Sequence, residues 1–184
     1  LKRIALPKIA KRRQEIVEAL KREGYDISIV NGGGTGSLNT TNQADCITEI
    51  TVGSALFSPM LFDFYKCFLY EPSLYFALPI VRKPTANIFT CLGGGYIASG
   101  PHGKDKVPRP VFPPDGKLMP LEGAGEVQTP DHYKNSALEV GDPIIFRAAK
   151  AGEICARFDK ISGAYDNSIV SSYLTYRGEG GHFL

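Results

Sequence analysis

Two short runs of small residues carry the clearest chemical signal in this sequence. The first, Asn31-Gly-Gly-Gly-Thr-Gly-Ser37, follows the β-rich run 27–30, and the second, Gly53-Ser54, follows the β-rich run 46–51. Glycine removes side chains where the backbone must approach a ligand, and it lets several N–H groups point at one anion. In (β/α)₈ barrels, phosphate is frequently bound by the loops after strands seven and eight. The two runs therefore predict one phosphate site formed by both loops.

Two better-known phosphate motifs do not fit the first run. The dinucleotide fingerprint needs a third glycine where Ser37 stands, and it needs a helix that the following residues do not predict. The P-loop needs a Gly-Lys-Ser or Gly-Lys-Thr triplet, which is absent. The remaining alternative to a shared phosphate site is a pair of unrelated tight turns.

The elements around these loops alternate between helix and strand. Apolar residues at helical spacing predict an amphipathic helix over residues 8–23, and Gly24 supplies its end. Strands are expected over 27–30 and 46–51, and a helix over 55–66. This order is typical of an α/β fold, which we expect over residues 1–75.

The later sequence changes character, because proline becomes frequent and short β-rich runs alternate with turns. An all-β domain is therefore expected over residues 76–184. The turns include Asp115-Gly116 and Gly141-Asp142-Pro143. The expected strands lie over residues 87–91, 125–128, 144–146, 154–161 and 168–175.

Composition excludes several classes of protein. The 184 residues carry 21 basic and 19 acidic side chains, so no basic excess points to nucleic acid or to a membrane surface. No apolar run approaches the ~20 residues that a membrane-spanning helix needs. The four cysteines form no Cys-x-x-Cys pair, and we expect reduced thiols in a cytoplasmic protein.

The two small-residue runs, with Thr48-Glu-Ile-Thr-Val ahead of the second, resemble D-threonine aldolases and D-serine dehydratases. These are pyridoxal-phosphate enzymes of the alanine-racemase fold type (fold-type III), in which a (β/α)₈ barrel precedes a β domain. Four later segments look more specifically like bacterial amino acid deaminase/aldolases. They are Leu92-Gly-Gly-Gly-Tyr-Ile-Ala-Ser-Gly100, Glu122-Gly-Ala-Gly-Glu-Val-Gln-Thr-Pro130, Ala149-Lys-Ala-Gly-Glu153 and Thr175-Tyr-Arg-Gly-Glu179.

The resemblance implies a cofactor and its phosphate site. The cofactor is pyridoxal 5′-phosphate, and residues 1–75 are the last β/α units of the barrel. The residues that bind the phosphate are Gly33, Gly34, Thr35, Gly53 and Ser54. The Schiff-base lysine of this fold lies at the end of the first barrel strand, which we expect outside this chain. The chain alone is then inactive, and it works as a homodimer or with an N-terminal half.

The resemblance also raises the question of a divalent metal. Those relatives bind one through a His-x-Asp or His-x-Cys pair after a Gly-Asp turn, but residues 141–159 contain no histidine, and Ala148 stands where relatives carry one. Glu153 and Cys155 are possible ligands, although a solvated acid and a buried thiol are the simpler interpretation. We expect Lys150 to replace part of the metal's charge near the substrate, with a plain surface lysine as the alternative. The histidines are expected on the surface, at positions 102, 132 and 182.

The expected function is therefore part of a pyridoxal-phosphate-dependent lyase that cleaves or deaminates a small amino acid. Two alternatives stay open. One is an amino acid racemase on the same scaffold. The other is a non-catalytic, truncated binding fragment.

Overall fold

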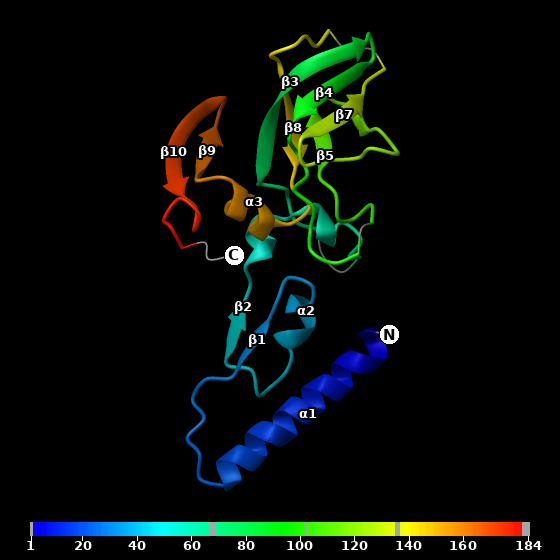
Figure 1. The fold of residues 1–184 in the computed structure, drawn as a ribbon. Helices are drawn as coiled ribbons and strands as arrows, with labels where there is room; N and C mark the ends of the chain where they lie inside the picture. Colours follow the sequence, from blue (N-terminus) through cyan, green and yellow to red (C-terminus); the bar gives the residue numbers. More distant parts are fainter. Residues whose placement is uncertain (1, 67–68, 102, 135–136, 182–184) are drawn as a thin grey trace. The chain divides into compact units, whose positions relative to one another are not determined.

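The computed structural model describes residues 2–66, 69–101, 103–134 and 137–181 (Figure 1). The chain divides into a first unit, Leu1–Leu56 with Phe64–Tyr70, and a second unit, Phe57–Asp63 with Glu71–Leu184. None of the described helices is long and apolar enough to cross a membrane. The helices and strands are α1 (Lys2–Arg22), β1 (Asn31–Gly33), α2 (Leu38–Thr41), β2 (Glu49–Thr51), the 3₁₀ turns η1 (Ser54–Leu56) and η2 (Met60–Phe62), β3 (Tyr75–Thr85), β4 (Ile88–Leu92), β5 (Arg109–Phe112), β6 (Lys117–Leu118), β7 (Gln128–His132), β8 (Pro143–Arg147), α3 (Ala151–Arg157), β9 (Lys160–Tyr165) and β10 (Ser168–Leu174).

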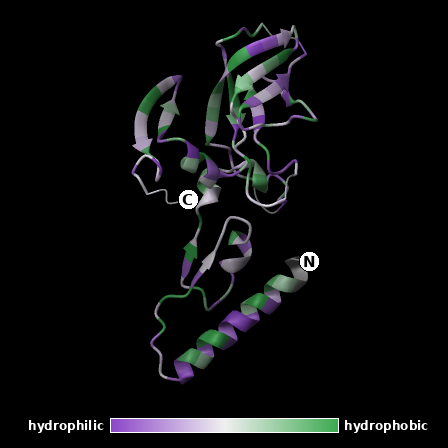
Figure 2. Cartoon of the chain, in the orientation of Figure 1, coloured by the Kyte–Doolittle hydropathy of each residue, from purple (hydrophilic) through white to green (hydrophobic). Residues whose placement is uncertain are grey.

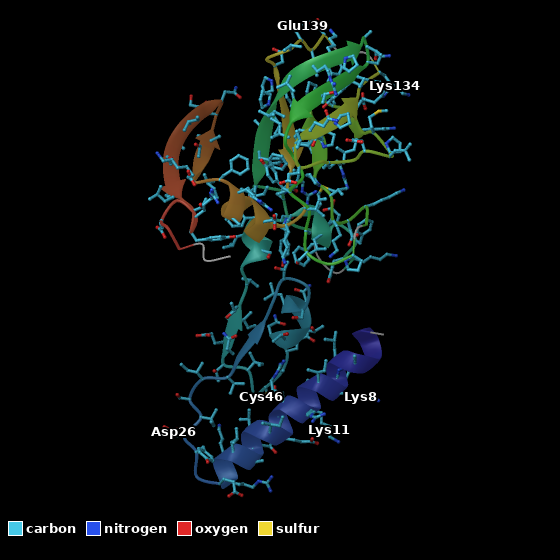
Figure 3. The ribbon with its side chains drawn as sticks, viewed as in Figure 1. Lys8, Lys11, Asp26, Cys46, Lys134 and Glu139 are labelled. Carbon is cyan, nitrogen blue, oxygen red and sulfur yellow. The ribbon has the colours of Figure 1, made fainter. Side chains whose placement is uncertain are left out.

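Helix α1 confirms the amphipathic helix expected over residues 8–23, and it begins six residues earlier. Figure 2 shows hydrophobic and hydrophilic bands alternating along it, and Figure 3 labels Lys8 and Lys11 on it. Gly24 ends the helix with a positive φ of 89°, and Tyr25 N–H returns to the Leu20 carbonyl at 3.1 Å. That bond satisfies a carbonyl that the end of a helix leaves open.

The strands of the first unit are shorter than the sequence predicts. Residues 27–30 are not strand, and β1 begins at Asn31, within the glycine run. Strand β2 keeps only the last three residues of the expected 46–51. A four-residue helix, α2, follows the glycine run, where none was expected. The place of this unit in a (β/α)₈ barrel stays a prediction.

The helix expected over residues 55–66 is wrong, because the chain instead makes the 3₁₀ turns η1 and η2. Pro59 is extended, with ψ of 159°, and has no N–H to give to a helix. The N–H groups of Met60 and Leu61 donate to the Ala148 and Ala149 carbonyls at 3.1 and 3.2 Å. Tertiary pairing has therefore replaced the helical hydrogen bonds.

The second unit is built on a six-stranded antiparallel sheet with the order β5-β8-β3-β4-β7-β6. The edge strands β5 and β6 lie close to each other, so the sheet is nearly a closed barrel. Strand β3 is a central strand of this sheet, because it pairs with β4 on one side and with β8 on the other (Figure 1). Alternate residues of β3 are buried, and Phe76, Leu78 and Ile80 enter the core, where Phe76 stacks on Phe146 at 5.4 Å.

Three of the expected strands of this unit are confirmed in substance, as β4, β8 and β10. The strand expected over 125–128 is wrong except for its last residue, because β7 runs from Gln128 to His132. Strands β3, β5 and β6 were not foreseen. Strand β3 contains Pro79 and Pro84, and Pro79 lies opposite Pro143 of β8 inside the ladder.

The strand expected over 154–161 is wrong except for its last two residues, and the mostly β second unit contains a short helix that was not expected. Residues Ala151–Arg157 form helix α3, with Ile154 buried beneath it, and the strand β9 begins only at Lys160. Strands β9 and β10 form a separate hairpin (Figure 1). Its turn residues Asp166 and Asn167 both have positive φ, as a two-residue type I′ turn requires.

Candidate functional site

The two small-residue loops leave the same edge of a parallel strand pair. Strands β1 and β2 pair in parallel, with Gly33 opposite Thr51. The glycine loop (residues 32–37) continues from β1, and the serine loop (residues 53–54) follows β2 by one residue. Carboxyl ends of paired parallel strands meet at one edge, so both loops begin side by side. Binding of a phosphate there stays a prediction.

Glycine is required at three positions of the glycine loop. A Cβ at Gly32 would lie 2.8 Å from the Thr41 methyl group and 2.9 Å from Ile47. Gly33 and Gly34 have φ of 136° and 99°, and a Cβ at Gly33 would collide with the Thr51 carbonyl oxygen. The backbone thus passes closer to β2 than any side chain permits.

Hydrogen bonds hold the rest of the glycine loop. Ser37 Oγ donates to the Gly33 carbonyl at 2.8 Å, and Ser37 N–H donates to the Gly34 carbonyl at 3.0 Å. The Thr35 residue is buried, with 5% of its surface exposed. The loop is therefore fixed by its own contacts before any ligand binds.

The serine loop is open by comparison. A Cβ on Gly53 would meet no atom within 4 Å, and Gly53 is not among the glycines with positive φ. Ser54 is half-buried and begins η1. The first N–H groups of a 3₁₀ turn have no partner within that turn. Open volume beside Gly53 and the first backbone N–H groups of η1 therefore occur together at this edge of the sheet.

In the second unit, the segments 92–100 and 122–130 pack together through their glycines. Gly93 N–H donates to the Val127 carbonyl at 2.8 Å, and Thr129 Oγ1 donates to the Gly93 carbonyl at 2.6 Å. A Cβ at Gly94 would collide with Thr129 Oγ1, and one at Gly95 would lie 2.8 Å from Glu126 N. These glycines permit close packing of two backbones.

The segments 92–100 and 175–179 both contact the segment 149–153, where helix α3 begins. Lys150, the residue before α3, donates from Nζ to Ser99 Oγ at 2.9 Å. Tyr176 donates its hydroxyl proton to the Gly152 carbonyl. Three segments that are far apart in sequence thus meet in the second unit. They carry two cations, Lys150 and Arg177, and Arg177 is paired with Asp159 at 3.2 Å.

No set of three or more His, Cys, Asp or Glu side chains within the described residues is arranged to hold a metal ion. Glu153 is paired with Arg157 at 3.1 Å. Burial raises the pKa of the Cys155 thiol, which favours the protonated form over the thiolate that binds metal. His132 is half-buried on β7, whereas His102 and His182 lie outside the described residues.

One buried acid was missed at the level of sequence. Asp131 on β7 is fully buried, and neither of its carboxylate oxygens has a hydrogen-bond partner; the neighbouring Tyr133 hydroxyl has none either. Burial raises the pKa of Asp131 to about 7. Burial raises the pKa of Cys91 to about 12, and the Asp131 charge adds to the effect. An alternating Thr129-Asp131-Tyr133 pattern was the available signal, but the strand was placed too early to reveal it.

Comparison with solved structures decides the fold. A D-threonine aldolase from Filomicrobium marinum superposes with a TM-score of 0.80 and 14% identity, over 94% of this chain and 48% of that one. The chain has the fold of half of that enzyme. The D-threo-3-hydroxyaspartate dehydratase from Delftia sp. HT23 gives a TM-score of 0.68 at 17% identity, over 93% of this chain and 51% of that one.

The barrel-like sheet of the second unit matches the C-terminal domain of these structures, so the resemblance inferred from sequence is confirmed for the fold. The chain spans about half the length of the solved structures that it matches. No family model and no curated protein matches it.

Proposed function

We propose that this chain is the cofactor-phosphate half of a pyridoxal-phosphate-dependent lyase that acts on a β-hydroxy D-amino acid. The observation that carries the proposal is the parallel β1–β2 pair, which starts two small-residue loops at one edge. It occurs in a chain whose fold is that of half a D-threonine aldolase. One named neighbour is an aldolase and the other a dehydratase. We therefore propose an aldol cleavage or a dehydration as the reaction.

The residues at this edge fit a phosphate group. Gly33 and Gly34 turn the backbone through positive φ, and the Gly53 position is open, so an anion can approach the backbone of both loops without meeting a side chain. The Gly34 N–H itself donates to the Thr51 carbonyl, so Gly34 contributes the path of the backbone and not a donor. We assign the phosphate to Gly33, Gly34, Thr35, Gly53 and Ser54. When bound, pyridoxal phosphate supplies an electron-withdrawing ring that stabilises negative charge at the substrate α-carbon.

This chain's own residues then contribute position and charge. Ser37 fixes the glycine loop through the Gly33 carbonyl, and this constrains where the phosphate is held. In the second unit, the Lys150 ammonium group stands 2.9 Å from Ser99 Oγ. We assign this pair to the substrate carboxylate or β-hydroxyl, where one positive charge stabilises developing negative charge.

The lysine that attaches the cofactor covalently belongs, in this proposal, to a barrel portion outside the chain. Two observations support a partner for the first unit, either an N-terminal half that carries this lysine or a second copy of the chain. The apolar residues Ile9 and Ile16 of α1 are 52% and 51% exposed. Two paired strands alone are also only marginally stable, and further strands beside β1 and β2 would stabilise them.

Amide NMR spectra of the chain test the assignment directly. Addition of pyridoxal 5′-phosphate should shift the amide signals of Gly33, Gly34, Thr35, Gly53 and Ser54 together, with one saturation curve. Inorganic phosphate should shift the same signals at higher concentration. Shifts confined to one loop, or to the second unit, would show that the two loops do not form one site.

A further inference from the structure

The second unit contains a cavity of about 820 Å³ that the proposed function does not use. It lies among the loops around β5 and β6, and Met60 is part of its lining. Cavities of a few hundred to about 1,000 Å³ are typical of sites for small organic molecules. The size is therefore suitable for a ligand with a body as large as an aromatic ring and a short chain.

The cavity lining combines an apolar floor with positive charge. The charged lining residues are Lys104, Arg109 and Lys117, and none of the described residues that line the cavity is acidic. Arg109 contacts Asp63 at 3.6 Å, but Asp63 also holds Arg147 at 2.7 Å. The single carboxylate of Asp63 thus pairs with two guanidinium groups. The cluster of Asp63, Arg109 and Arg147 therefore keeps a net positive charge.

Both methionines of the chain line this cavity, Met60 and Met119. Methionine is unbranched and polarisable, and it adapts to ligands of different shape. The fully buried Pro108 adds a rigid part of the floor. The lining therefore suits an apolar body whose charged end faces the lysines.

We propose that this cavity binds a small organic anion, with an apolar body on the methionine floor and an anionic head between Lys104 and Lys117. The site lies wholly within the second unit and is independent of the pyridoxal phosphate proposal. It requires no loop of the first unit and no cofactor. Electrostatic attraction at these exposed lysines should weaken as salt is added.

Methyl NMR of the chain labelled with ¹³C at the methionine methyl groups tests the site, because its two signals both report on the cavity. The probes are 4-phenylbutyrate, 3-phenylpropyl phosphate and the neutral 4-phenyl-1-butanol, each without pyridoxal phosphate. We expect both anions to shift the two signals with saturation, at least about 5-fold more tightly than the alcohol. The anion that binds more tightly identifies the head group as carboxylate or phosphate.

The double variant Lys104→Gln/Lys117→Gln should weaken anion binding about 10-fold and change alcohol binding less than about 2-fold. Both lysines are exposed, so the fold should persist, and unchanged methionine signals without ligand would verify this. The matched control is Lys21→Gln/Lys160→Gln, which changes the same net charge outside the cavity and should leave binding unaltered. Equal affinity for the alcohol and the anions, or methionine signals that none of the probes moves, would overturn the proposal.

Discussion

The backbone N–H of Gly34 donates to the carbonyl oxygen of Thr51 at 2.8 Å, directly after the last paired residues of β1 and β2. This bond fastens the glycine loop to the strand from which the serine loop leaves. The geometry of one loop is therefore coupled to that of the other. The coupling is the structural basis for treating them as one site.

Gly33→Ala should break this link. The new methyl group would collide with the Thr51 carbonyl, and the φ of 136° is strained for alanine, so we expect a loss of at least about 2 kcal/mol. Hydrogen exchange of the Gly34 amide should become faster by more than tenfold. Gly24→Ala is the matched control, because it has φ of 89° and no atom within 4 Å of a new Cβ, and it should cost about 1 kcal/mol. Similar effects for both variants would contradict close packing at Gly33.

Arg147→Met should destabilise the second unit by about 3 kcal/mol, because it leaves a half-buried carboxylate without its main partner. Arg147 is 11% exposed, bonds both oxygens of Asp63 at 2.7 and 3.1 Å, and donates to the Ser58 carbonyl at 2.6 Å. Arg109→Met is the matched comparison, since Arg109 reaches the same Asp63 at 3.6 Å and is 53% exposed. It should cost less than about 1 kcal/mol in urea unfolding. A larger loss for Arg109→Met would contradict this ranking.

Asp131 should make the stability depend on pH. Its pKa is raised by burial from 3.8 to about 7, so the folded state holds a proton that the unfolded state has released between these values. Stability should therefore fall as pH rises from about 4 to 7, by up to about 4 kcal/mol, and change little above that from this group.

Asp131→Asn removes the titration and isolates this effect. The difference in unfolding free energy between the variant and the parent chain should grow in favour of the variant from pH 5 to pH 8. Other groups titrate in both proteins and cancel in the difference. A difference that stays constant over this range would show that Asp131 is charged in the folded state.

Sequence anticipated the local features of this fold better than its long-range pairing. Gly24, the Gly141 turn and strands β4, β8 and β10 follow from residue type and alternation. The helix over 55–66 failed because Ala148 and Ala149 accept hydrogen bonds from that segment, and nothing near residue 60 reports this. Strand β3 was not predicted because prolines interrupt its sequence, although the antiparallel pairing places Pro79 opposite Pro143.

The candidate sites also differ in how far the sequence predicts them. The glycine positions near β1 were recognisable because conformation and close approach demand glycine there. The Lys150–Ser99 contact and the buried Asp131 were not, since each depends on which strands and loops meet in space.

Lys150→Met should lower D-threonine cleavage about 10²-fold in a protein that also contains the remaining barrel, whereas a chelator should leave that activity nearly intact. The reason is that an ammonium group at this place supplies one positive charge without a metal. Lys160→Met, on the exposed strand β9, is the control and should have no effect. Activity that is lost with a chelator and restored by zinc or manganese would contradict this role.

Borohydride reduction of the chain with pyridoxal 5′-phosphate, followed by peptide mapping, should give no stoichiometric label on any single lysine. This follows from the proposal that the covalently bound lysine lies outside the chain. Low, scattered labelling of exposed lysines is expected from their free amines. A full label on one lysine would place the covalent attachment within these 184 residues.

The ratio of the dissociation constants for pyridoxal and pyridoxal 5′-phosphate tests the central claim most directly. The account predicts that the phosphate improves binding at least about tenfold, as charge-assisted hydrogen bonds from the two loops require. Gly53→Val should abolish this gain without loss of stability, because its side chain enters open space, while Ser168→Val on β10 should preserve the gain. Equal binding of the two compounds, or a gain that survives Gly53→Val, would contradict a phosphate site at this edge.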